Sequence, residues 1–191
     1  MKILLETERL ILRQFTEDDT DNLFELNSDP EVVRFTQDRQ IERSVIQTEM
    51  LPKIFAYYEK YDGYGVWAAI EKSSQEFIGW FLFRAVEYAS YFDPALANKS
   101  DIELGYRLRK VFWGKGYATE GSKALIFKGF EDLGTQCVVS VALTANVASI
   151  RVMQKAGLKL EKRFIYEAIG QEVVIYVLPK DEFKVKNCIT N

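Results

Sequence analysis

The sequence predicts a mixed α/β domain built around one sheet, and three observations favour this fold class. The 191 residues are 48% hydrophobic and 28% charged, which is the composition of a globular protein with a real core. Apolar residues recur with strand and helix periods in the order strand, helices, three strands, long helix, strand, short helix, two strands. No repeat, low-complexity segment or linker interrupts that order, so we expect a single domain over residues 1–191, with its core at about 6–178 and a polar tail at 180–191.

Polar residues and a proline mark the first helical segments. Thr16 and Asp19 have the spacing of a capping pair ahead of a helix at about 17–27. Residues 41–60 also follow a helical pattern. Pro52 inside this segment predicts a kink or a break into two helices, because proline lacks the backbone N–H that a helix interior requires.

The first half of the chain also contains segments with the alternation of strands. They cover residues 8–15, 64–71 and 77–86, and the short loop between the last two predicts a hairpin of antiparallel neighbours. The connection over residues 87–100 is long for a compact domain. Its aromatic rings either line a substrate entrance or pin the loop to the core.

Residues 103–133 read as a strand ending at Leu108, a Gly-rich turn ending at Gly116 and a long helix. Gly121 and Gly129 each cost a helix about 1 kcal/mol relative to Ala, so we expect close packing on the sheet to explain them. Apolar residues on most faces indicate a largely buried helix: Leu125, Ile126, Phe127 and Phe130.

The C-terminal part supplies the remaining strands. A strongly apolar strand at 136–144 is followed by Asn146, a good N-cap, and a helix at 147–156. Strands at 158–168 and 172–178 predict a final hairpin.

The turn before the long helix has the features of an anion site. Gly114 and Gly116 let the backbone turn sharply and let a ligand approach closely, because neither carries a Cβ. The following helix directs its free N–H groups and the positive end of its dipole toward the turn, which suits a phosphate or pyrophosphate. The phosphate-loop fingerprints with fixed spacing do not fit, since position 119 is Thr. The turn alone therefore also allows a plain connection into a helix.

The composition excludes several classes of chemistry. The chain contains no His, so Ser-His-Asp and Cys-His catalysis, a His base and His-ligated metals are ruled out. A net charge of −3 without a basic block argues against a nucleic-acid carrier. No apolar run approaches the length of a membrane span, and an early acidic residue argues against a secretory signal, so we expect a cytoplasmic protein. Cys137 is expected in the core and Cys188 near the tail, without a zinc or redox motif.

Segments in fixed relation carry a family resemblance. The chain opens with E-R-L-I-L-R (residues 8–13), and L-G-Y-R-L (104–108) precedes W-G-K-G-Y-A-T-E (113–120). The segment N-V-A-S-I-R-V-M-Q-K-A-G-L (146–158) follows about thirty residues later, and the two longer segments are specific as a pair. Over roughly residues 6–178 the chain resembles the GNAT superfamily (GCN5-related N-acetyltransferases), particularly its Rim-type branch of ribosomal-protein N-terminal acetyltransferases.

The resemblance implies a GNAT fold, with a mostly antiparallel mixed sheet of about seven strands, splayed in the middle and flanked by about four helices. It also implies acetyl-CoA as cosubstrate and no metal. The family's pyrophosphate motif, Gln/Arg-x-x-Gly-x-Gly/Ala, falls on residues 113–118. Trp113 at the first position is a tolerable departure from this motif, because most contacts there should come from main-chain N–H groups from about Val111 to Ala118. The residues that the resemblance assigns to coenzyme A are Leu108, Val111, Phe112, Trp113, Gly114, Lys115, Gly116, Tyr117, Ala118, Thr119, Asn146 and Ser149.

The expected reaction is direct attack of a primary amine on the acetyl thioester. Glu103, the only carboxylate within the central strand, is the candidate base, directly or through water, and the alternative is a solvated charge at the strand end. Met153 stands where many family members have a Tyr acid, so Ser149 is the local candidate acid and Tyr166 is another. The Ser149 hydroxyl could instead bond a carbonyl one turn earlier in its helix. Backbone N–H groups near Leu108 should stabilise the carbonyl oxygen.

We therefore expect an acetyl-CoA-dependent N-acetyltransferase whose acceptor is a protein N-terminal amine or a small-molecule amine. The alternative from another class is a catalytically silent CoA-binding sensor or interaction module of the same fold. No nucleic-acid or membrane partner is expected, whereas a homodimer is open, because splayed sheets with exposed edges often pair. The segments expected to bind the acceptor, about 27–61, 88–100 and the last hairpin, carry no decisive charge signature.

Overall fold

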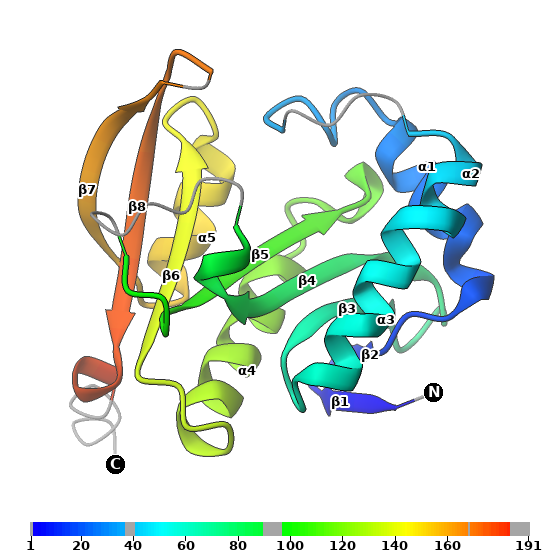
Figure 1. The fold of residues 1–191 in the computed structure, drawn as a ribbon, viewed down its shortest axis with the longest axis horizontal. Helices are drawn as coiled ribbons and strands as arrows, with labels where there is room; N and C mark the ends of the chain where they lie inside the picture. Colours follow the sequence, from blue (N-terminus) through cyan, green and yellow to red (C-terminus); the bar gives the residue numbers. More distant parts are fainter. Residues whose placement is uncertain (1, 37–40, 90–96, 168, 184–191) are drawn as a thin grey trace. The chain divides into compact units, whose positions relative to one another are not determined.

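Strands and helices alternate through the part of the chain that the computed structural model describes, residues 2–36, 41–89, 97–167 and 169–183 (Figure 1). The strands are β1 (Ile3–Glu6), β2 (Leu10–Arg13), β3 (Gly65–Glu71), β4 (Phe77–Ala85), β5 (Ile102–Leu108), β6 (Cys137–Leu143), β7 (Lys159–Tyr166) and β8 (Gln171–Pro179). The α-helices are α1 (Thr20–Ser28), α2 (Arg43–Val45), α3 (Leu51–Lys60), α4 (Tyr117–Glu131) and α5 (Val147–Lys155). Shorter helical turns are η1 (Glu17–Asp19), η2 (Ile46–Met50), η3 (Val86–Tyr88) and η4 (Lys110–Phe112).

Hydrogen bonds join the eight described strands in the order β1-β2-β3-β4-β5-β6-β8-β7. The pairs β1–β2, β2–β3, β6–β8 and β7–β8 are antiparallel, whereas β5 and β6 run parallel. The parallel ladder is short, since it pairs Ile102 with Val138 and Glu103 with Val139 at the start of β5. A mixed, mostly antiparallel sheet with flanking helices confirms the predicted fold class, with β1 as a strand that the sequence analysis did not include.

Two compact units divide the chain. The first comprises Met1–Leu82 and Tyr106–Gly121, and the second comprises Phe83–Gly105 and Ser122–Asn191. The expectation of a single domain stays a prediction, and each unit is described by itself.

In the first unit, a buried apolar cluster joins α1 and α3 to β3. Leu23 and Leu26 of α1 and Ile54 of α3 share this cluster with Ala68 and Ile70 of β3. Each fully buried Leu or Ile side chain stabilises the fold by about 1.5–3 kcal/mol. The helices therefore fix the position of β3, the neighbour of β4 in the sheet.

The predicted helix boundaries of this unit are largely confirmed. The Asp19 carboxylate accepts a hydrogen bond from the Thr16 N–H at 2.9 Å, as expected for the start of the first helical segment. Residues 43–60 stay helical through Pro52, with the π turn η2 between α2 and α3, so the predicted break into two separate helices is wrong and the predicted kink stays a prediction. Pro52 is the second residue of α3 and directly follows the π turn, where its missing N–H leaves a gap in the helical hydrogen bonds.

In the second unit, β7 and β8 form the predicted C-terminal hairpin, paired from Lys159–Val177 to Tyr166–Gln171. The N-cap of α5 is also as predicted, since the Asn146 side chain accepts the Ser149 N–H at 3.1 Å.

The glycines of α4 are explained by aromatic side chains of β4. A Cβ on Gly121 would lie 2.3 Å from Cζ of Phe81, and a Cβ on Gly129 would lie 2.5 Å from Cζ of Phe83. Non-bonded carbon atoms do not approach one another so closely. The helix can therefore lie against these rings only with glycine at both positions. The expectation of close packing is confirmed.

Two expectations need correction. β1 pairs with β2, although no strand was expected at residues 3–6. Phe127, expected on a buried face of α4, is 57% exposed and lies edge-on to Phe183. Residues 180–183 form a helical turn that places Phe183 against Phe130, and the polar tail over residues 180–191 stays a prediction.

Other expectations fall partly outside the described residues. Residues 90–96 of the predicted long connection, and Cys188, are not among them. Cys137 is half-buried at the start of β6, and burial raises the pKa of its thiol to about 11, so it is neutral at pH 7.

Candidate active site

The end of β5 leads into the predicted Gly-rich turn within the first unit. Leu108 is buried, and its carbonyl oxygen accepts a hydrogen bond of 2.7 Å from Nε1 of Trp113. Phe112 is buried edge-on against Tyr117 at a centroid distance of 6.1 Å. The rings therefore anchor the two ends of the turn, one to the strand and the other to α4.

The glycines give this turn its shape. Gly114 has φ +75° and Gly116 has φ +87°, in the left-handed region that residues with a Cβ rarely adopt. A Cβ on Gly114 would meet no atom within 4 Å, so there is open space beside this residue. The whole stretch from Trp113 to Gly116 is exposed.

Several backbone N–H groups at the turn have no acceptor among the residues that the structure describes. Within the described part of the chain, no hydrogen bond engages the N–H groups from Gly114 to Thr119. The next N–H, of Glu120, donates to the Gly116 carbonyl at 3.0 Å and so begins the helical ladder. By contrast, the N–H groups of Phe112 and Trp113 are engaged by carbonyls of the preceding turn. The free donors therefore begin at residue 114, later than the sequence analysis placed them.

Such an arrangement suits a phosphate or pyrophosphate. Consecutive N–H donors without a hydrogen-bond acceptor lie at the start of α4, together with the positive end of its helix dipole. Lys115 adds a positive charge with no carboxylate partner among the described residues; its Nζ lies 5.2 Å from the centroid of the Phe112 ring. The neighbouring Arg109 and Lys110 instead lie near Glu25 and Glu31, at 3.5 and 3.1 Å.

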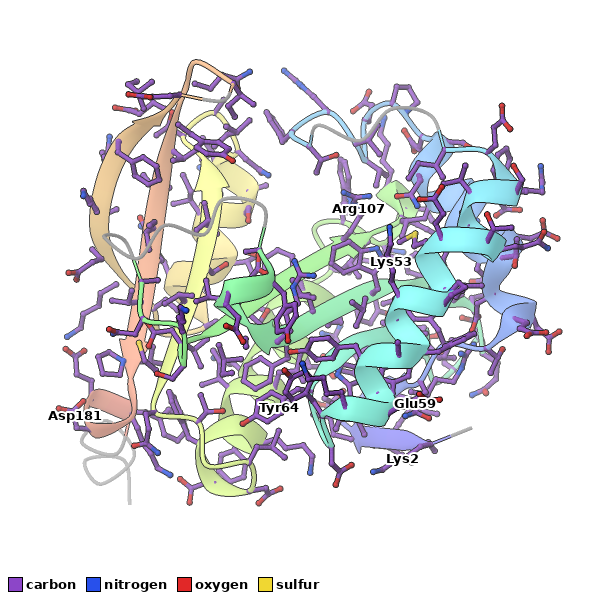
Figure 2. All side chains as sticks on the ribbon, viewed as in Figure 1. Lys2, Lys53, Glu59, Tyr64, Arg107 and Asp181 are labelled. Atoms are coloured by element: carbon purple, nitrogen blue, oxygen red, sulfur yellow. The ribbon has the colours of Figure 1, made fainter. Side chains whose placement is uncertain are left out.

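Arg107, which Figure 2 labels, lies in β5 directly before Leu108. It donates a hydrogen bond to Oδ1 of the buried Asn27 and its guanidinium carbon lies 5.2 Å from the ring centroid of Trp80. A guanidinium held on both an amide and an aromatic face has a fixed direction.

The sequence analysis did not assign Arg9 and Glu120 to the site, yet they contact the turn directly. Arg9 Nη1 donates to the Lys115 carbonyl at 3.0 Å. Arg9 also donates from its N–H and its Nε to the two carboxylate oxygens of Glu120, at 2.9 and 2.7 Å. Both residues lie in the segments that carry the family resemblance, so the sequence marked these segments as important. No local sequence pattern, however, predicts a contact between residues so far apart in the chain.

Glu103 is not the solvated strand-end charge that the sequence left open. Its side chain is only 12% exposed, and Oε2 accepts from Nε of Arg84 at 3.1 Å. The Arg84 guanidinium therefore occupies one oxygen of the Glu103 carboxylate. Its role as the catalytic base stays a prediction.

The remaining predicted residues also lie in the second unit. Asn146 and Ser149 form the start of α5, and Tyr166 ends β7. Ser149 is half-buried, with its N–H held by Asn146. The parts of these residues in binding or catalysis stay predictions.

The Trp113→Phe variant tests whether the indole hydrogen bond holds the turn against β5. The substitution removes the N–H donor and keeps an aromatic ring. A lost hydrogen bond of this kind costs about 1 kcal/mol, so the KM for acetyl-CoA should rise about fivefold. Steady-state kinetics check this, with kcat and the melting temperature nearly unchanged. A KM equal to that of the wild type would show that the bond does not position the turn.

Neither a metal centre nor a membrane span appears among the described residues. They contain no group of three or more Cys, Asp and Glu side chains that could hold a metal ion. No described helix is both long enough and apolar enough to cross a bilayer.

Comparison with known proteins agrees with this geometry. Residues 9–159 match the family described as "Acetyltransferase (GNAT) domain". The FsC-acetyl coenzyme A-N(2)-transacetylase of Aspergillus fumigatus is 30% identical over 81% of this chain, which covers 64% of that relative's length. The uncharacterized N-acetyltransferase YoaA of Bacillus subtilis is 30% identical over 86% of this chain and 89% of that relative's length.

A solved structure of similar fold is the ribosomal L7/L12 alpha-N-protein acetyltransferase RimL in complex with coenzyme A. It superposes with a TM-score of 0.76 and 18% identity, covering 95% of this chain and 99% of that one. At this identity the likeness shows the fold alone, so placement in the Rim-type branch stays a prediction. The family match spans well over half of the sequence, and the chain therefore belongs to the GNAT acetyltransferase family, as an N-acetyltransferase with acetyl-CoA as its cosubstrate.

Proposed function

We propose that the chain transfers the acetyl group of acetyl-CoA directly to a primary amine, with the segment 108–119 holding the cosubstrate. The observation that supports this proposal is the run of free N–H donors from Gly114 to Thr119 at the start of α4. A diphosphate offers acceptor oxygens and negative charge to such donors. Leu108 lies a few residues before them, where the thioester end of the carrier is expected.

The proposed reaction needs no covalent enzyme intermediate. The amine nitrogen attacks the thioester carbonyl carbon, the carbon–sulfur bond breaks and coenzyme A leaves as a thiolate. The nitrogen loses a proton and the thiolate gains one. A free thiol has a pKa of about 8.5, so an acid helps the departure without being essential. We keep Glu103 as the base, acting through water because Arg84 occupies its carboxylate, and Ser149 or Tyr166 as the acid.

The acceptor is proposed as a protein N-terminal amine or an amine on a small molecule. Both classes occur in the names of structural neighbours, since one is an aminoglycoside acetyltransferase and another is an alpha-N-protein acetyltransferase. A cytoplasmic location, a possible homodimer and the absence of nucleic-acid and membrane partners stay predictions.

Release of free thiol from acetyl-CoA in the presence of an amine panel tests the proposal. The panel holds amino acids, polyamines, aminoglycosides and peptides with free N-termini. We expect amine-dependent release with at least one member, and N-acetylated product by mass spectrometry. Tight binding of coenzyme A without turnover of any amine would instead favour the silent sensor or interaction module.

A further inference from the structure

We propose that Arg9 and Glu120 are positioning residues, which hold the turn before α4 in the shape that binds the diphosphate of acetyl-CoA. This inference rests on the proposed function of the turn and adds to it the N-terminal segment of the chain. Arg9 directly precedes β2, whereas Glu120 lies in the first turn of α4. Neither residue is proposed to touch the acetyl group or the amine.

Contacts to both carboxylate oxygens of Glu120 hold its side chain and that of Arg9 in place. The Arg9 N–H and the Thr7 hydroxyl donate to Oε1 at 2.9 and 2.5 Å. Nε and Nη2 of Arg9 both approach Oε2, at 2.7 and 2.5 Å. A fork of two guanidinium nitrogens together with a backbone N–H fixes the orientation of Arg9 more closely than a single ion pair would.

The remaining guanidinium nitrogen reaches the turn. Arg9 Nη1 donates to the Lys115 carbonyl at 3.0 Å. This carbonyl shares a planar trans peptide group with the Gly116 N–H, so the two point in opposite directions. By fixing the carbonyl, Arg9 directs the Gly116 N–H away from itself and outward. The Arg9 guanidinium carbon also lies 4.5 Å from the ring centroid of Tyr117, the first residue of α4.

The Glu120 side chain is ionised at neutral pH. Burial alone would raise its pKa, but the hydrogen bonds from Thr7 and Arg9 outweigh burial and hold the pKa below its ordinary value of 4.5. A carboxylate with a lowered pKa contributes its stabilisation above the ordinary value and loses it as the pH falls through the lowered one. The turn should therefore keep its shape throughout the neutral range.

Little stability is expected from this pair as such. The Arg9 side chain is 39% exposed and that of Glu120 is 18% exposed, and ion pairs in such positions contribute little net free energy. The pair should therefore affect the orientation of the turn more than the stability of the fold. A positioning role can thus be distinguished from a merely structural one by comparing coenzyme A binding with the melting temperature.

The test compares acetyl-CoA with acetyl-pantetheine, a thioester that lacks the diphosphate, in Arg9→Ala, Arg9→Lys and Glu120→Gln variants. Misplaced donors should raise the KM for acetyl-CoA about tenfold or more in Arg9→Ala, with kcat nearly unchanged. The kcat/KM for acetyl-pantetheine should equal that of the wild type. Arg9→Lys keeps the charge without the fork, so it should fall between the wild type and Arg9→Ala. Calorimetry with coenzyme A should show the same ranking of Kd.

Arg13→Lys is the matched control. Arg13 donates from both terminal nitrogens to Asp19, at 2.7 and 2.8 Å, and none of its hydrogen bonds within the described residues reaches the turn. This variant should lower the melting temperature and leave the preference for acetyl-CoA over acetyl-pantetheine intact. If Arg9→Ala fails to fold, Thr7→Val and Arg9→Lys supply the comparison.

The outcomes separate this inference from the proposed function. Folded Arg9 variants with wild-type affinity for coenzyme A would overturn the positioning role and leave the proposed function standing. A wild-type protein that used acetyl-pantetheine as well as acetyl-CoA would instead contradict the diphosphate site itself. Equal losses with both thioesters would show that Arg9 acts on folding and would also overturn the positioning role.

Discussion

A Gly79→Ala variant is expected to lower the melting temperature by about 10 °C and to impair acetyl transfer. A Cβ at this position in β4 would lie 2.1 Å from the carbonyl oxygen of Arg107 and 2.7 Å from Cα of Leu108. Both are backbone atoms, so no side-chain rotation can relieve the overlap. Gly79 also has φ +140°, which residues with a Cβ rarely adopt. Overpacking of about 1–3 kcal/mol and backbone strain of about 1–3 kcal/mol therefore add at one position.

The catalytic consequence follows from the location of the overlap. The Arg109 N–H donates to the Ile78 carbonyl at 2.8 Å, so β4 and the end of β5 are held together beside Gly79. Displacing this end moves Leu108, where the thioester is proposed to lie. We expect kcat/KM for acetyl-CoA to fall about tenfold or more at temperatures where the variant is folded.

Thermal unfolding followed by circular dichroism measures the stability effect, with Gly170→Ala as the control. Gly170 also has a positive φ, of +63°, but a Cβ there would meet no atom within 4 Å. Its substitution should cost only the strain of about 1–2 kcal/mol. Equal melting temperatures for the two variants would show that the approach of β4 to the Leu108 backbone does not constrain the fold.

The second large effect is expected from the double substitution Gly114→Ala with Gly116→Ala. An added Cβ has space at both positions, with its nearest neighbour at 3.4 Å in the case of Gly116. The left-handed backbone is nevertheless unfavourable by about 1–2 kcal/mol per residue with a Cβ. The turn should relax away from the binding shape, and restoring that shape should weaken coenzyme A binding about thirtyfold or more.

Isothermal titration calorimetry with coenzyme A measures this loss, and Gly134→Ala provides the control. Gly134 also has a left-handed φ, of +74°, with open space around it, but it lies in the turn after α4. Its substitution should lower stability by a similar amount per residue and leave the Kd unchanged. A double variant that bound coenzyme A as tightly as the wild type would remove Gly114 and Gly116 from the account of the site.

The corner from Leu108 to Thr119 could be predicted from the sequence because its determinants are local. Apart from the direction of the Gly116 N–H, which Arg9 influences through the Lys115 carbonyl, the two glycines, the strand before them and the helix after them are enough to place the free N–H groups at the start of α4. The same holds for the capping side chains Asp19 and Asn146, each of which contacts a backbone group three residues away.

The contacts of Arg9 could not be predicted in this way. Its partner Glu120 is 111 residues away in the sequence, and no periodicity relates such positions. Trp113 was interpreted as a tolerable departure from the family motif, whereas the structure gives its indole a defined acceptor in Leu108. Glu103 could not be distinguished from a solvated charge, because the presence of Arg84 beside it depends on the register of two strands.

A crystal structure of the protein with coenzyme A tests the central claim most directly, because it shows which groups meet the diphosphate. The account predicts that diphosphate oxygens lie within about 3.2 Å of backbone nitrogens in the segment from Gly114 to Thr119. A diphosphate bound elsewhere, with these N–H groups facing only water, would contradict it.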